Sequence, residues 1–280
     1  MKLVQKIAVA YVRYKLKLLS LISGKKAASY AFKLFCTPPT RDVKDLPPVF
    51  REAEELHFHF DSYDIIGYRW NKGGNKRVLI IHGFESTAVN FERYIHPLVS
   101  KGYEVLAFDA PAHGRSSGKQ ITALVYRDLV KYVHTQYGPV LSYMSHSFGG
   151  LALGLALAEM PQNESYRAVF IAPSSETSTA IDHFFNFLQI GNGVKEEFGK
   201  VIVAESGHPV SWFTLQRTMV DIKAKILWVH DEDDSITPLR DALKVKAENY
   251  PNAEFVITKG LGHSRIYRDA EVTRLVVDFL

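Results

Sequence analysis

A strand, a serine and a helix follow one another without a break in residues 140–150. A short apolar run of β-forming character ends at Ser147, and an apolar run of helical character begins directly after it. A serine on such a turn is held in a strained backbone conformation, so the residues two before and two after it must be small. These residues are Ser145 and Gly149. We therefore predict a sharp strand-to-helix turn at Ser147, against the alternative that this serine only caps the helix.

Strand and helix patterns alternate along most of the chain. Besides the strand before Ser147, buried strands are predicted at 78–81, 104–108, 168–172, 226–230 and 254–258. Helices are predicted at 87–101, 122–137, 148–160 and 238–250, with a last helix closing the chain. This alternation is typical of a mostly parallel sheet wrapped by helices through right-handed crossovers. In such sheets functional residues gather beyond the carboxyl ends of the strands.

An antiparallel hairpin is predicted ahead of these strands, at an edge of the sheet. Apolar residues and histidines alternate from 56 to 60, and a second strand follows a polar turn at 65–70. The two histidines, His57 and His59, share one face of the first strand. Because no third ligand follows nearby, we interpret them as solvent-facing residues and expect no metal site.

Two later strands are followed by the residues that a reactive serine needs. A serine hydroxyl is a weak nucleophile until a base takes its proton, and the base needs an orienting carboxylate. The strand at 226–230 is followed by the acidic loop 231–238, and the strand at 254–258 by a glycine-rich loop that ends in His263. We expect a serine, an acid and a histidine, in that chain order, to meet beyond the sheet.

These motifs resemble those of the α/β-hydrolase superfamily, and the resemblance extends over residues 56–280. The turn at Ser147 is similar to the family's nucleophile elbow, small-x-Ser-x-Gly, with Ser145 in the place usually held by glycine. The acidic loop resembles the family's Gly-x-x-Asp-x-x-x-Pro loop, which places Asp234 on the acid and Asp231 where glycine is usual.

Two further loops carry the same resemblance. The loop before His263 is similar to the family's Gly-x-Gly-His loop. Residues 109–116 are similar to the family's Asp-x-x-Gly-x-Gly-x-Ser loop, with Ala112 and His113 around the turn. The resemblance implies an α/β-hydrolase fold, with a mostly parallel eight-stranded sheet wrapped by helices and a small cap insertion.

The resemblance also implies a role for each site residue. Ser147 is expected to attack a substrate carbonyl, His263 to accept the serine proton and pass it to the leaving group, and Asp234 to hold the imidazole. The attack gives the carbonyl oxygen a negative charge. This oxyanion is expected to accept hydrogen bonds from the backbone N–H groups of Phe148, at the start of the helix, and of Phe84.

Other residues compete for these roles. Asp233 becomes the acid if the register of its loop slips by one residue, and Glu176 follows a neighbouring strand. His82, His113 and His146 lie near the expected site in sequence, and we interpret all three as structural hydrogen-bonding residues rather than bases.

The strand and helix pattern lapses between residues 172 and 226. A segment of this length exceeds a usual crossover, so we interpret about 174–223 as a cap within a hydrolase domain of residues 51–280. Its apolar side chains either line an acyl pocket or pack the helices of the cap together. They are Phe184, Phe185, Phe187, Leu188, Ile190, Phe198, Trp212 and Phe213.

Charge is unevenly distributed along the chain. Residues 1–40 carry eight basic residues and no acid, whereas the net charge of the whole chain is +4, so the remaining residues sum to −4. A mildly acidic body argues against a nucleic-acid partner. The single cysteine, Cys36, excludes a disulfide within the chain and fits a cytoplasmic, reducing compartment.

The basic N-terminal part, residues 1–50, is predicted to be an amphipathic helix followed by a proline-rich connector at 37–50. Charged residues interrupt its apolar run, so it predicts neither a signal peptide nor a membrane span. Two interpretations stay open. Residues 1–24 either contact an anionic membrane surface at its periphery or pack on protein. The apolar side of the helix is formed by Leu3, Ile7, Tyr11, Tyr14, Leu18, Leu21 and Ile22, and the basic side by Lys2, Lys6, Arg13 and Lys17.

The nucleophile and the residue after it distinguish this chain from several branches of the family that it resembles. Haloalkane dehalogenases and epoxide hydrolases need a carboxylate nucleophile, and perhydrolase-like members tend to carry methionine where this chain has Phe148. We expect a serine esterase or thioesterase that acts on a small to medium, apolar acyl substrate without a cofactor. A C–C bond hydrolase, an acyltransferase and a non-catalytic ligand receptor are the alternatives.

Overall fold

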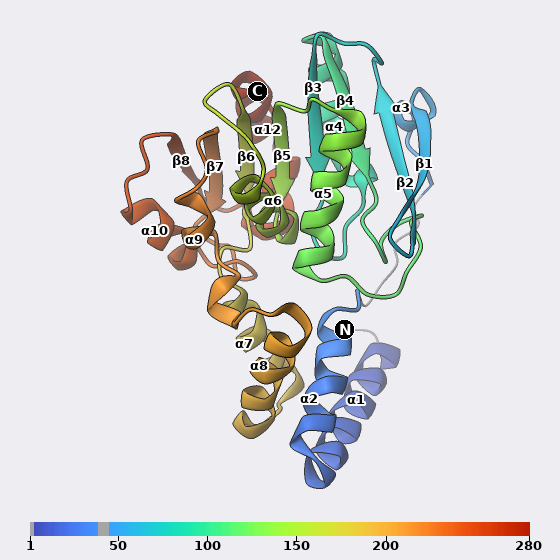
Figure 1. Ribbon diagram of the computed structural model, residues 1–280, viewed down its shortest axis with the longest axis vertical. Helices are drawn as coiled ribbons and strands as arrows, with labels where there is room; N and C mark the ends of the chain where they lie inside the picture. The colour runs from blue at the N-terminus through green and yellow to red at the C-terminus, as the bar shows by residue number, and fades with distance from the viewer. Residues whose placement is uncertain (1–2, 39–44) are drawn as a thin grey trace. The chain divides into compact units, whose positions relative to one another are not determined.

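A computed structural model describes residues 3–38 and 45–280. Within these residues an eight-stranded sheet has the order β1-β2-β4-β3-β5-β6-β7-β8 (Figure 1). The pairs β1–β2 and β2–β4 are antiparallel, and all other neighbours are parallel. The strands are β1 (Glu54–Phe60), β2 (Tyr63–Trp70), β3 (Lys76–Ile81), β4 (Tyr103–Phe108), β5 (Ser142–His146), β6 (Arg167–Ile171), β7 (Lys225–Asp231) and β8 (Ala253–Thr258). The predicted α/β class and mostly parallel sheet are confirmed.

The predicted hairpin forms the β1 edge of this sheet. Leu56 is buried, whereas His57 and His59 face solvent on the other side of β1. His57 lies 2.7 Å from the carboxylate of Glu55, and His59 lies 2.7 Å from that of Asp64. The two histidines therefore face solvent, as predicted, and each has an acidic neighbour.

Helices cover both faces of the sheet. On one face α4 (Glu92–Ser100) and α12 (Ala270–Phe279) contact each other and pack on alternate strand residues, among them Val105 and Val229. Figure 1 shows α5 (Ala123–Tyr137) and α6 (Phe148–Glu159) in front of the sheet. The central strands are thus buried on both sides, which explains their continuous apolar sequences.

Two short segments differ from the prediction. The helix predicted at 87–101 is a 3₁₀ turn, η1 (Ala88–Phe91), followed by α4. The connector predicted at 37–50 contains the start of α3 (Pro48–Arg51), because proline is well suited to the first turn of a helix. Lys2 and residues 39–44 lie outside the described residues. The other short elements are α9 (Leu215–Met219), α10 (Leu239–Ala247), α11 (Gly262–Arg265) and η3 (Ile266–Arg268).

The described residues form two compact units. The helical unit consists of the described part of 1–37 together with Glu176–Phe213, and the sheet unit consists of the described residues of Pro38–Ser175 and Thr214–Leu280. The helical unit contains α1 (Leu3–Ile22), α2 (Gly24–Phe35), α7 (Thr177–Leu188), α8 (Asn192–Ser206) and η2 (Val210–Trp212). The N-terminal helices thus share a unit with most of the predicted cap, a grouping that the sequence did not indicate.

Aromatic packing explains this grouping. Phe198 of α8 is fully buried. The centroid of its ring lies 5.6 Å from that of Phe35 of α2 and 5.2 Å from that of Phe185 of α7. Phe184 stands edge-on to Phe35 at 5.3 Å. These phenylalanines of the cap therefore pack its helices together, which is one of the two interpretations left open. Phe187, by contrast, is exposed.

Candidate active site

Ser147 lies between β5 and α6 in an uncommon backbone conformation. Its φ is 55° and its ψ is −123°, a combination that costs energy for any residue with a Cβ. Three backbone hydrogen bonds hold it there. The Ser147 N–H donates to the carbonyl of Ile171, and the Ser147 carbonyl accepts from Gly150 and Ser174. The predicted sharp turn is confirmed.

The turn closes because its neighbours are small. A Cβ on Gly149 would lie 2.4 Å from the carbonyl oxygen of His82 and 2.7 Å from that of Ile81, which no side chain tolerates. Ser145, in the place usual for glycine, is fully buried and donates its hydroxyl to the carbonyl of Val169 at 3.0 Å. That hydrogen bond satisfies the extra hydroxyl, so the departure from glycine leaves the turn intact.

Three side chains predicted for the site form a chain of hydrogen-bonding contacts. The Ser147 Oγ is 2.9 Å from the Nε2 of His263, and the His263 Nδ1 is 2.8 Å from the Oδ2 of Asp234. They come from the loops after β5, β8 and β7, at the carboxyl ends of parallel strands. The imidazole thus bridges a hydroxyl and a carboxylate, which is the geometry of general-base catalysis.

The Asp234 carboxylate is buried and held by its own loop. Its Oδ1 accepts hydrogen bonds from the amides of Ile236 and Thr237, both at 2.9 Å, and its Oδ2 accepts from the Thr237 hydroxyl. Burial raises the pKa of Asp234, but the hydrogen bond and charge of His263 and these amides outweigh burial and lower it. An ionised Asp234 fixes the proton of His263 on Nδ1 and leaves Nε2 as the acceptor for the serine.

Asp231 organises the loop that carries His263. Its Oδ1 accepts from the Gly262 amide at 2.8 Å, and its Oδ2 accepts from the Thr258 hydroxyl at 2.7 Å and the Leu261 amide at 3.1 Å. Burial raises the pKa of Asp231, yet these hydrogen bonds lower it overall. In the sequence Asp231 stood out only because glycine is usual at its position in the family's acid loop. Its role in holding the loop that carries His263 was not predicted.

The competing acids lie elsewhere. Asp233 directs its carboxylate to the amide of Gly260 at 3.0 Å. Glu176 belongs to the helical unit, where it directly precedes α7. Of these carboxylates, Asp234 is the one that meets the imidazole of His263.

Two backbone segments flank Ser147. Phe148 is the first residue of α6, so its N–H has no acceptor within the helix. On the other side, a Cβ on Gly83 would lie 2.9 Å from the Cβ of Ser147, so the backbone just before Phe84 passes directly beside the serine. The rings of Phe84 and Phe148 meet edge-on at 5.7 Å. Ser147 therefore has candidate amide donors beside it, carried by two residues whose aromatic rings contact each other.

Three histidines near the site bind backbone carbonyls. The Nδ1 of His82 donates to Gly83 and its Nε2 accepts from the amide of Ala110, which ties the end of β3 to the loop after β4. His113 donates to the carbonyl of Pro111, and the Nε2 of His146 donates to the carbonyl of His263 at 3.1 Å. These contacts agree with the structural roles predicted for all three.

The buried His82 predicts a loss of stability in mild acid. Burial lowers its pKa to about 4, whereas an unfolded histidine titrates near 6.5. Below pH 6.5 the unfolded state therefore binds the extra proton first, and the free energy of unfolding falls as the pH falls towards 4. At pH 5 His82 alone is expected to remove about 2 kcal/mol.

Urea unfolding at pH 8 and pH 5 measures this loss. His82→Gln removes the titrating group, so the difference between the two pH values should shrink by about the same 2 kcal/mol, whatever the variant's absolute stability. An unchanged pH difference in His82→Gln would show that another group causes the acid sensitivity.

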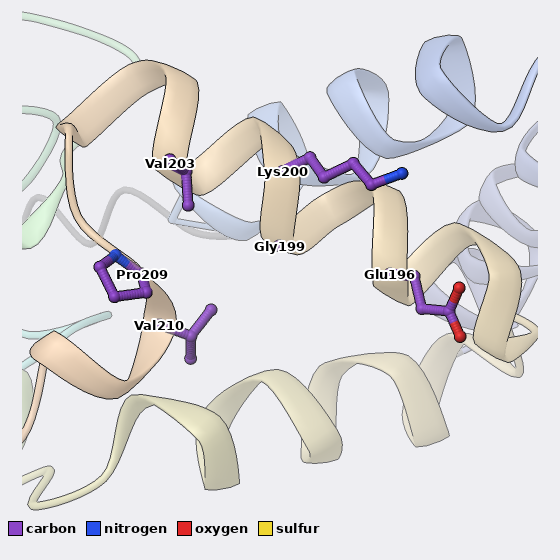
Figure 2. A pocket seen from close by; sticks show the side chains of 6 residues that line it. All are labelled: Glu196, Gly199, Lys200, Val203, Pro209 and Val210. Carbon is purple, nitrogen blue, oxygen red and sulfur yellow. The ribbon is translucent and has the colours of Figure 1, made fainter.

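A separate hollow lies in the helical unit and holds none of this chemistry. It has a volume of about 410 Å³ and is lined by Glu196, Gly199, Lys200 and Val203 of α8 and by Pro209 and Val210 at the start of η2. Figure 2 shows these residues on the two segments. Its lining offers one carboxylate and one amine but no nucleophile paired with a base. Among the described residues, no group of three or more histidine, cysteine, aspartate or glutamate side chains is placed to hold a metal ion.

The sheet order, the turn at Ser147 and the Ser147–His263–Asp234 contacts define an α/β hydrolase. The chain belongs to the alpha/beta hydrolase family, whose model matches residues 78–275. This match begins within β3, includes β4 to β8, and covers every residue placed in the candidate site.

Individual relatives agree with this family. The chain is 27% identical over 255 residues to the 2-hydroxy-6-oxo-6-phenylhexa-2,4-dienoate hydrolase of Burkholderia cepacia, covering 74% of this chain and 88% of that protein. It is 29% identical over 106 residues to the uncharacterized hydrolase YugF of Bacillus subtilis, covering 36% of this chain and 38% of that protein. The solved esterase Pf2001 of Pyrococcus furiosus superposes with a TM-score of 0.66 at 22% identity, over 88% of this chain and 97% of that one, which shows a shared fold.

Proposed function

We propose that this α/β hydrolase is a serine esterase or thioesterase that works through an acyl-enzyme. The observation that carries the proposal is the continuous contact from the Ser147 hydroxyl through the imidazole of His263 to the buried carboxylate of Asp234. A hydroxyl in hydrogen-bonding contact with an oriented imidazole is the activated nucleophile of acyl transfer.

The proposed reaction has two halves. The Ser147 Oγ attacks the substrate carbonyl while the His263 Nε2 takes its proton, and the same nitrogen then protonates the leaving alcohol or thiol. In the second half His263 takes a proton from water, which attacks the acyl carbon; the bond to the Ser147 Oγ breaks, His263 returns the proton to Oγ, and the acid is released. The Asp234 carboxylate stabilises the imidazolium that forms in each half.

Backbone donors are proposed to bind the oxyanion. The N–H of Phe148 is free of the helix because it is the first residue of α6, and the backbone before Phe84 lies against Ser147. Donors of this kind are each worth about 3 kcal/mol of transition-state stabilisation. Because both are backbone groups, they are available whatever side chains these positions carry.

An apolar acyl group of small to medium size is supported by the aromatic residues close to Ser147. The rings of Phe84 and Phe148 meet beside Ser147, and Tyr126 lies 5.8 Å from Phe148. The cap phenylalanines offer less support, because Phe185 and Phe198 are buried in their own unit.

A second candidate is hydrolysis of a C–C bond. It rests on the similarity to the Burkholderia cepacia dienoate hydrolase, which covers most of both chains. The same serine, base and acid serve either reaction. Turnover of 2-hydroxy-6-oxo-dienoates without turnover of esters would favour it.

A fluorophosphonate probe tests the proposed nucleophile. The wild-type protein should be labelled covalently, Ser147→Ala should resist the probe, and Ser165→Ala, at an exposed serine ahead of β6, should label like the wild type. A wild-type protein that resists labelling as fully as Ser147→Ala would contradict the proposal.

Graded chromogenic esters and acyl-thioesters then test the substrate class. We expect kcat/KM to be highest for short and medium acyl chains and to fall for charged ones. Tight binding with negligible turnover across both panels would favour a ligand receptor on a hydrolase scaffold instead.

A further inference from the structure

Helix α1 has a second apolar face that its own unit does not cover. One side of the helix is packed, with Leu16 buried. The opposite side carries six large apolar residues that are each 43–78% exposed, here called the α1 stripe. They are Ile7, Tyr11, Tyr14, Leu18, Leu21 and Ile22.

The spacing of these residues makes the stripe continuous. Successive members from Ile7 to Leu21 are four, three, four and three residues apart, so they lie on one face of the helix, over a length of about 20 Å. Soluble proteins rarely leave an apolar surface of this extent open to water unless it binds something.

Lysines border the stripe. Lys17 lies along one edge, one helical turn from Tyr14 and Leu21, and Lys15 lies along the other, where its ammonium stands over the ring of Tyr30 at 4.2 Å. Lys25 and Lys26 are exposed directly after the end of α1. No acid occurs anywhere in residues 1–40, so every charged residue that this part of the chain contributes to the border is basic.

This charge pattern indicates whether the α1 stripe binds a second copy of the chain or an anionic surface. If the stripe paired with the same stripe of a second copy, Lys15 and Lys17 would face the lysines of that copy, and like charges beside an apolar seam destabilise pairing. An anionic surface has the opposite sign and attracts every lysine of the border.

We propose that α1 binds the surface of an anionic membrane, with its stripe inserted at the interface and its lysines on the lipid headgroups. Tyr11 and Tyr14 suit this position, because a tyrosine ring is apolar at one end and polar at the other. The helix lies in the plane of the surface. Among the described helices, none has both the length and the apolar character that crossing a bilayer requires.

Vesicle sedimentation of the full chain tests this binding. The protein should sediment with phosphatidylcholine vesicles that contain phosphatidylglycerol, and not with phosphatidylcholine alone. Salt that shortens the Debye length from about 10 Å to about 3 Å should weaken binding strongly. Equal binding to both vesicle types, or to neither, would overturn the proposal.

Paired variants separate the contribution of the apolar stripe to membrane binding from that of the lysines. Leu18→Ser with Leu21→Ser should lower partitioning about a hundredfold, whereas Val220→Ser with Leu243→Ser, at exposed positions of the sheet unit, should leave it unchanged. A stripe variant that sediments like the wild type would contradict insertion.

Charge variants test the lysines in the same way, with a matched control in the sheet unit. Lys17→Gln, Lys25→Gln and Lys26→Gln combined should also cost about a hundredfold in partitioning. The same change of net charge at exposed lysines of the sheet unit should cost much less. This control combines Lys223→Gln, Lys225→Gln and Lys246→Gln.

Two measurements in solution test whether the α1 stripe instead binds a second copy of the chain or packs in the protein's own core. Light scattering should give a monomer, and the stripe variant should unfold at the same urea concentration as the wild type. A dimer that Leu18→Ser with Leu21→Ser dissociates would assign the stripe to a second copy. A large loss of stability in that variant would assign it to the protein's own core, and either result would overturn the membrane proposal.

Discussion

Replacing Ser147 by alanine is expected to lower kcat for ester hydrolysis by about 10⁴- to 10⁶-fold. The substitution removes the only atom of residue 147 that contacts the Nε2 of His263, so no covalent acyl-enzyme forms. The backbone amides beside the serine remain, and we expect them to sustain a residual rate above that of the uncatalysed reaction. Single-turnover and steady-state assays on the best chromogenic ester measure the loss.

The fold of Ser147→Ala should be unaffected. Alanine also carries a Cβ, so the strain at a φ of 55° is the same, and the three backbone hydrogen bonds of residue 147 involve no side-chain atom. Thermal unfolding should therefore match the wild type. If the variant retained more than about a hundredth of the activity while folded, another nucleophile would have to be sought.

The loops of the site were predictable because each follows a buried strand, whereas the choice of Asp234 within its loop rested on the resemblance to the α/β-hydrolase acid loop. Ser147 needs small neighbours at a strand-to-helix turn, and both the turn and the reason for Gly149 can be deduced from sequence. Asp234 and His263 follow buried strands, and parallel strands bring such loops to one edge of a sheet. Chain order and strand patterns alone therefore predict which loops meet.

The helical unit was not predictable by the same rules. The packing of Phe35 on Phe184 and Phe198 joins segments about 150 residues apart in the chain, and no local pattern specifies which apolar faces will pair. Helix α2 itself was missed, although Ser23 caps it and buried alanines at 27, 28 and 31 form its packed face. Asp231 was missed in its supporting role for a similar reason, because its partners lie on another loop.

Replacing Asp234 by asparagine is expected to lower kcat/KM by about 10⁴-fold. The reason lies in the loop that holds the carboxylate. The amides of Ile236 and Thr237 both donate to Oδ1, so the asparagine must keep its oxygen there and turn its NH₂ group towards His263. An NH₂ donor beside Nδ1 forces that nitrogen to accept, and the ring proton moves to Nε2.

The consequence for Ser147 is direct. With a proton on Nε2, the imidazole of His263 presents a donor to the serine hydroxyl and no longer takes its proton. Asp233→Asn is the matched control, since the neighbouring carboxylate accepts a hydrogen bond from the Gly260 amide and an asparagine oxygen accepts that bond equally well. This control should keep activity within about threefold of the wild type. If Asp233→Asn lost the activity and Asp234→Asn kept it, the acid of the reaction would be the neighbouring residue.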